Sequence, residues 1–150
     1  MNRVALGKGA IVGILGGIVA MVGAMLPWWN VTASAGGFSV GLPVLGIFWI
    51  GGILALVFGI LGLVFSALKQ PVMGILALVM GLLVAVVSMV YGAMVPTASV
   101  SAGGASGSIT AGFGYWISLI GGLLLAIGGA IGFIEGRKAP AIQTAPPAPY

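Results

Sequence analysis

Four long apolar runs dominate the chain, at positions 9–26, 47–68, 72–95 and 115–134. None of them has a charged residue in its interior. A helix needs about 20 residues to cross the hydrocarbon core of a bilayer, and each run has about that length. The pattern therefore predicts an all-α integral membrane fold, a bundle of four transmembrane helices.

The composition supports this class. Hydrophobic residues make up 61% of the 150 positions, and charged residues only 4%. A soluble domain typically has about 25% charged residues, so this chain could not keep a water-facing surface. These proportions exclude a soluble enzyme, a disulfide-stapled secreted domain and a nucleic-acid binder. The lipid bilayer is the first expected partner.

The basic residues predict the orientation, because Lys and Arg collect on the cytoplasmic side of membrane proteins. Segments 28–46 and 96–114 carry no charge, whereas all the basic residues fall on the other side of the predicted helices. We therefore expect a multi-pass protein of the cell membrane with both termini in the cytoplasm. The basic residues are Arg3, Lys8, Lys69, Arg137 and Lys138.

Aromatic residues gather near the outer ends of the runs. Trp and Tyr favour the headgroup layer, because their rings combine an apolar body with a polar edge. We interpret them as interfacial anchors; gripping a ligand is the alternative. The anchors are Trp28, Trp29, Trp49, Tyr115 and Trp116.

The chain also repeats itself. Segment 23–27 (GAMLP) recurs at 92–96 (GAMVP), segment 34–37 (SAGG) recurs at 101–104, and Trp49 corresponds to Trp116. We expect one membrane domain, 1–138, made of two parallel helix-hairpin repeats at about 9–68 and 72–136. A pseudo-two-fold axis along the membrane normal is the simplest arrangement of such repeats.

Each uncharged outer segment has β-favouring residues on both sides of a Gly pair, Gly36-Gly37 in the first and Gly103-Gly104 in the second. This pattern is typical of a β-hairpin. An isolated hairpin is only marginally stable, so we expect two short extracytoplasmic hairpins that pair into a small sheet. Flexible Gly/Ser loops are the alternative.

Stripes of small residues run along every predicted helix. Helices in membranes associate through such stripes, because close backbone approach replaces the missing hydrophobic effect. We expect tight packing within the bundle and contact of surplus glycine faces, on the first and fourth helices, with neighbouring subunits. The stripe at 128, 132 and 136 is expected to meet a partner helix. The proposed packing and assembly residues are Gly9, Gly13, Gly17, Gly52, Gly59, Gly62, Gly128, Gly132 and Gly136.

The residue inventory leaves little chemistry. His, Cys and Asp are absent, and Glu135 is the only carboxylate. The common zinc, copper and haem ligands are missing, and so are the base of a catalytic relay and a pair of carboxylates. We expect no enzymatic activity, no cofactor and no metal.

The last segment, 139–150, is rich in proline. It is predicted to be an extended cytoplasmic tail. Residues 146–149 match a minimal PxxP pattern, which is common in linkers.

The exit from the first run, Leu26-Pro27-Trp28-Trp29, followed by a glycine-rich second helix, resembles small uncharacterised prokaryotic four-helix membrane proteins. The chain also resembles claudin-like tetraspan proteins, in topology only. Neither resemblance implies an activity or a functional residue for this chain.

Three functions fit these observations. The first is a structural or accessory membrane subunit that packs laterally in a larger assembly, with other membrane-protein subunits or with copies of itself. The second is a passive channel or transporter for a small neutral solute, although the spans offer it little more than serine hydroxyls. The third is a claudin-like adhesion or barrier protein acting through its outer loops.

Overall fold

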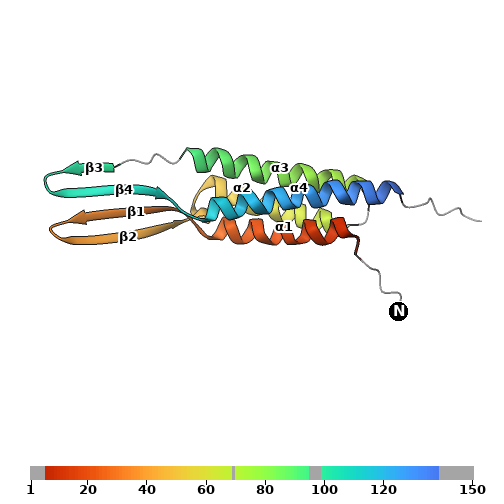
Figure 1. The fold of residues 1–150 in the computed structure, drawn as a ribbon, viewed down its shortest axis with the longest axis horizontal. Coiled ribbons are helices and arrows are strands. Elements are labelled where there is room, and N and C mark those ends of the chain that lie inside the picture. Colours follow the sequence, from red (N-terminus) through yellow and green to blue (C-terminus); the bar gives the residue numbers. More distant parts are fainter. Residues whose placement is uncertain (1–5, 69, 95–98, 139–150) are drawn as a thin grey trace, which may run out of the picture.

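The computed structural model describes residues 6–68, 70–94 and 99–138. Four helices run alternately up and down and form an elongated bundle (Figure 1). Each is long and apolar enough to cross a membrane, which confirms that the four apolar runs form long helices. Arg3, Lys69 and the predicted proline-rich tail at 139–150 lie outside the described residues. The helices are α1 (Lys8–Met25), α2 (Ile50–Ala67), α3 (Pro71–Ala93) and α4 (Gly114–Lys138).

The connection between α2 and α3 is short because Pro71 can start a helix but cannot continue one. Pro71 occupies the first turn of α3, where a missing backbone N–H costs nothing. α4 packs extensively against both α1 and α3, and α2 closes the square with less extensive contacts. All neighbouring helices in this square are antiparallel.

Two β-hairpins extend from one end of the bundle and join into a single sheet (Figure 1). Both turns are two glycines with positive φ, at Gly36-Gly37 and Gly103-Gly104, the conformation that a tight hairpin turn requires. The predicted hairpins and their pairing are therefore confirmed. The strands are β1 (Pro27–Ala35), β2 (Phe38–Leu45), β3 (Ser99–Ala102) and β4 (Ala105–Ala111), and a 3-10 turn, η1 (Gly46–Phe48), leads from β2 to α2.

The sheet does not follow the expected pseudo-two-fold axis. Its strand order is β2-β1-β4-β3, with every neighbouring pair antiparallel. A two-fold axis exchanging the halves would place equivalent strands together at the centre, β1 beside β3 or β2 beside β4. The two hairpins instead join in a head-to-tail manner through β1 and β4.

The bundle is packed with small residues inside and large apolar residues outside. The buried positions of the helices are mostly Gly, Ala and Ser. The exposed faces carry long aliphatic side chains, such as Ile11, Leu15 and Ile18 on α1. A soluble bundle has the opposite distribution, so this arrangement is typical of helices surrounded by lipid.

Candidate functional site

The glycines of α4 form two seams, one for each of its two main neighbours. An added Cβ at Gly9 or Gly128 would come within 3.0 Å of backbone on the partner helix across the α1–α4 contact. The same holds for Gly81 and Gly129 across the α3–α4 contact. In both contacts, each step of three or four residues along α1 or α3 is matched by a step of the same size in the opposite chain direction along α4. The backbones therefore touch along most of the bundle length.

This geometry places part of the stripe at 128, 132 and 136, which was expected to face a neighbouring subunit, inside the chain's own bundle. Gly128 contacts Gly13 of α1, and Gly136 contacts Pro71 at the start of α3. An added Cβ at Gly132 would meet nothing within 4 Å; Gly132 lines a cavity at the end of the bundle, and its backbone lies against Gly9. Gly128 and Gly136 are therefore used inside the chain, whereas contact of Gly132 with a neighbouring subunit stays a prediction.

The other glycines of the proposed packing set also contact the chain's own elements. Gly17 and Gly59 lie in the α1–α2 contact, and Gly62 packs against the side chain of Leu125 on α4. Gly52 packs against the backbone of Gly46 in η1. All are buried except that Gly132 and Gly136 are half-buried at the rim of the cavity.

Trp28 is not an interfacial anchor, because its side chain is completely buried. Its indole N–H donates a hydrogen bond of 3.0 Å to the carbonyl oxygen of Gly23. The ring fits against Gly46 and Gly114, where an added Cβ would overlap it. Trp28 thus closes the bundle at the sheet end, held between α1, η1 and α4.

The other predicted anchors lie at the same end of the bundle and remain accessible. Trp49 and Trp116 are 45% and 53% exposed, whereas Trp29 and Tyr115 are half-buried. Trp29 contacts Trp49 edge-to-face, with ring centroids 4.3 Å apart. Their placement around the base of the sheet is compatible with an aromatic belt.

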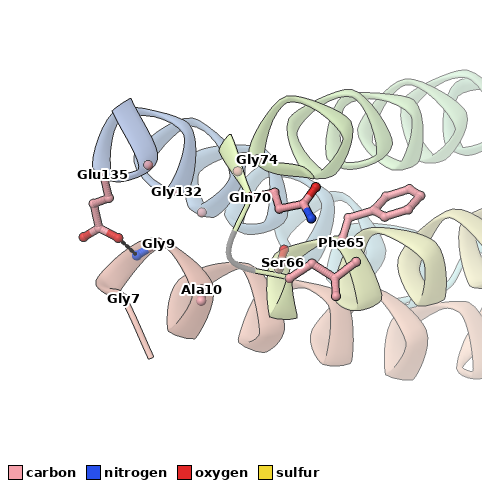
Figure 2. Close-up of a pocket in the computed structure, with 13 residues that line it drawn as sticks. Gly7, Gly9, Ala10, Phe65, Ser66, Gln70, Gly74, Gly132 and Glu135 are labelled. Atoms are coloured by element: carbon pink, nitrogen blue, oxygen red, sulfur yellow. Dashed lines mark hydrogen bonds between the residues drawn. The ribbon is translucent and has the colours of Figure 1, made fainter. Parts of the chain in front are cut away.

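At the opposite end, all four helices contribute to a cavity of about 200 Å³. Figure 2 shows Glu135 at its rim, with Ser66 and Gln70 contributed by α2 and the following turn. Much of the remaining lining is glycine. The lining residues include Gly7, Gly9, Ala10, Phe65, Leu68, Gly74, Gly128, Gly129, Gly132 and Gly136.

Glu135 acts as a cap for another helix. Its Oε2 accepts a hydrogen bond of 3.2 Å from the backbone N–H of Gly9 (Figure 2). The first N–H groups of a helix have no intrahelical partner, and their positive dipole end favours a carboxylate. Gly7, the residue before α1, provides no side-chain cap, so Glu135 on α4 supplies one. Sequence reasoning missed this role because the two residues are far apart in the chain.

Three buried serines divide into two kinds. The Ser118 hydroxyl donates a hydrogen bond of 3.2 Å to the carbonyl oxygen of Ala20, linking α4 to α1. Ser66 and Ser88 have hydroxyl oxygens without a hydrogen-bond partner among the described residues. Ser66 lies against Gly13 at the inner part of the cavity. These hydroxyls are not assembled with Glu135 into an acid–base or nucleophilic pair in the described hydrogen bonds.

The sheet has two chemically different faces. Residues directly opposite each other across the strands share a face, and one row across all four strands consists of Ser39, Ser34, Ser106 and Ser101. The next row on the other face consists of Phe38, Ala35, Ala105 and Ala102. The apolar face has an open hollow of about 490 Å³ near the turns, bordered by Phe38, which is 81% exposed.

Hydroxyl pairs mark the joint between the two hairpins. The Oγ atoms of Ser34 and Ser106 are 2.6 Å apart. Thr32 Oγ1 and Ser108 Oγ are also 2.6 Å apart. Both pairs connect β1 to β4, so the joint between the halves is held by side-chain hydrogen bonds as well as by the backbone ladder.

In comparisons with known proteins, no protein-family model matches the chain, and no curated protein matches it.

Proposed function

We propose that this protein is a structural or accessory membrane subunit that assembles laterally with other membrane proteins, copies of itself included. The observation that carries the proposal is the uncharged sheet, which projects from the bundle and whose edge strands have no partner within the described part of the chain (Figure 1). Exposed sheet edges with apolar side chains favour pairing with another chain. We place the assembly in the cell membrane, with the sheet outside and both termini in the cytoplasm.

The bundle supports a scaffold role more than a reaction. Its single carboxylate caps α1, and its glycines bring the helix backbones into contact. The duplicated helix–hairpin–helix order gives two hairpins that stand side by side, and we propose that it arose from two parallel repeats. Each repeat contributes one half of the projecting sheet.

The experiment is extraction of the full chain in a mild detergent or directly into lipid nanodiscs, followed by native gel electrophoresis and mass measurement. A stoichiometric complex, with itself or with other membrane proteins, is the expected result. A lone monomer under both conditions contradicts the proposal.

Passage of a small neutral solute is the second candidate, and the cavity beside Glu135 is the observation that favours it. The cavity is at one end of the bundle, while Leu125, Val84 and Trp28 are completely buried between it and the sheet. A polar path would have to replace these contacts. Flux of neutral solutes into liposomes containing the purified protein, compared with empty liposomes, distinguishes this function from the first.

A further inference from the structure

Among the described residues, both edges of the sheet present unpaired backbone. β2 and β3 are the outer strands, and natural edges usually carry a charge, a bulge or a proline that prevents pairing. The part of β2 next to the turn has none of these, and Phe38, Val40 and Leu42 are strongly exposed there. Pro43 follows and limits this open part. The open part of β2 is thus similar in length to the short strand β3.

We propose that β3 of one molecule pairs with β2 of a neighbouring copy standing upright in the same membrane. This inference rests on the proposed lateral assembly. It identifies the partner as a second copy of the chain and the contact as the β3–β2 pairing. β2 runs toward the bundle and β3 runs away from it (Figure 1). Two copies with the same orientation therefore bring the strands together antiparallel, and the alternation of directions in the sheet continues from one molecule to the next.

The chain already contains a joint of this kind. By the sequence repeat, β1 corresponds to β3, since both end in Ser-Ala before a Gly pair, and β2 corresponds to β4. The pairing of β1 with β4 inside the molecule is therefore the counterpart of β3 pairing with β2 of the next copy. The head-to-tail strand order, which breaks the two-fold axis, is the order that such an array requires.

The internal joint specifies the register of the external one. Inside the chain, Ser34 lies opposite Ser106 and Ala35 opposite Ala105. Replacing each residue by its counterpart places Ser101 opposite Ser39 of the next copy, and Ala102 opposite Phe38 of that copy. The Ser34–Ser106 hydroxyl contact would thus be reproduced by Ser101 and Ser39. The exposed Phe38 ring would lie over small residues on the apolar face.

The width of the four-stranded sheet agrees with the width of the helix bundle. Four strands at a spacing of about 4.8 Å repeat after about 19 Å. Two packed helices, with axes about 8–10 Å apart, occupy about 16–20 Å. A row of bundles in the membrane can therefore stand at nearly the same spacing as the sheet repeat above them.

Cysteine cross-linking tests the joint, because the chain has no cysteine of its own. Full-length Ser39→Cys and Ser101→Cys variants are produced separately, with different affinity tags, and reconstituted together in lipid vesicles under a mild oxidant. We expect a disulfide between one variant and the other, on the order of tenfold above the like-with-like products, because apposed thiols have a high effective concentration. The Ser39→Cys/Ser101→Cys double variant is expected to form a ladder of multimers.

An internal control reports folding of the sheet. The Ser34→Cys/Ser106→Cys variant should form a disulfide within one chain, since these residues already touch. If this control closes and the mixed variants do not, the β3–β2 joint is wrong. Cross-linking of Ser39→Cys only to itself also overturns it, because that result indicates a two-fold interface.

The native mass separates this inference from the function on which it rests. A native complex in nanodiscs, combined with no disulfide between Ser39→Cys and Ser101→Cys in vesicles, contradicts the β3–β2 pairing and leaves lateral assembly supported. A monomer in nanodiscs and no cross-link in vesicles contradict both.

Discussion

Glu135, near the end of α4, accepts a hydrogen bond from the backbone N–H of Gly9 in the first turn of α1, at 3.2 Å. The bond joins the last helix of the chain to the first and provides α1 with the cap that its own sequence lacks. The only carboxylate of the protein is therefore explained by helix capping.

Replacing Glu135 with Ala should lower the free energy of unfolding by about 1 kcal/mol, the typical effect of losing a helix cap. Glu135→Gln keeps a neutral acceptor and should lose less. Reversible unfolding in mixed micelles with increasing SDS measures both variants. Equal stability of Glu135→Ala and the unmodified protein would show that the bond makes no net contribution.

Two glycines of the stripe at 128, 132 and 136, Gly128 and Gly132, provide a matched pair. Gly128→Ala places a Cβ under 3.0 Å from the backbone of Gly13, so it should destabilise the protein by about 1–3 kcal/mol through overpacking. Gly132→Ala meets nothing within 4 Å and should be neutral or slightly stabilising, because Ala is the better helix former. The same SDS titration compares them. Equal effects at the two positions would contradict the described α1–α4 contact.

Trp28 and Trp116 form a second matched pair. Trp28→Phe removes the hydrogen bond to Gly23 and leaves a void, so we expect a loss of about 2 kcal/mol. Trp116→Phe, on a half-exposed ring, should change stability by less than about 0.5 kcal/mol. Thermal unfolding in detergent measures both. In fluorescence quenching, loss of Trp28 should remove the least accessible emission, and the reverse pattern would contradict its burial.

Labelling of single cysteines tests the orientation. Cysteine at Ala105, in the exposed sheet, should react with a membrane-impermeant maleimide in intact cells. Cysteine at Ala141, after the basic pair Arg137 and Lys138, should react only after permeabilisation, because basic segments remain in the cytoplasm. Labelling at Ala141 but not at Ala105 in intact cells would reverse the topology.

Much of the local structure could be predicted without coordinates. Hydropathy is a property of continuous segments, so the four spans follow from the runs themselves. The two hairpins follow from Gly36-Gly37 and Gly103-Gly104, because few other residues adopt the positive φ of a tight turn. The small-residue stripes likewise follow from helical spacing alone.

The partner of each stripe could not be predicted in this way. Spacing shows that Gly128 and Gly132 share a face of α4, but it does not show which helix approaches that face. By its residue type and its place at the end of an apolar run, Trp28 resembles an interfacial anchor. It is buried because Gly46 and Gly114, distant in the chain, leave room for its ring. The cap at Glu135 also depends on a residue more than 100 positions away.

The sequence by itself thus determined the elements: four apolar helices, two glycine-turn hairpins and the charge asymmetry between the two ends. These depend on backbone conformation and on transfer from water to lipid, which are decided residue by residue and over short segments. Only the tertiary structure decided that Gly128 of α4 packs against α1, that Trp28 closes the bundle, and that β1 joins β4. Those outcomes depend on close contact between distant segments, where the space available beside a backbone selects the partner.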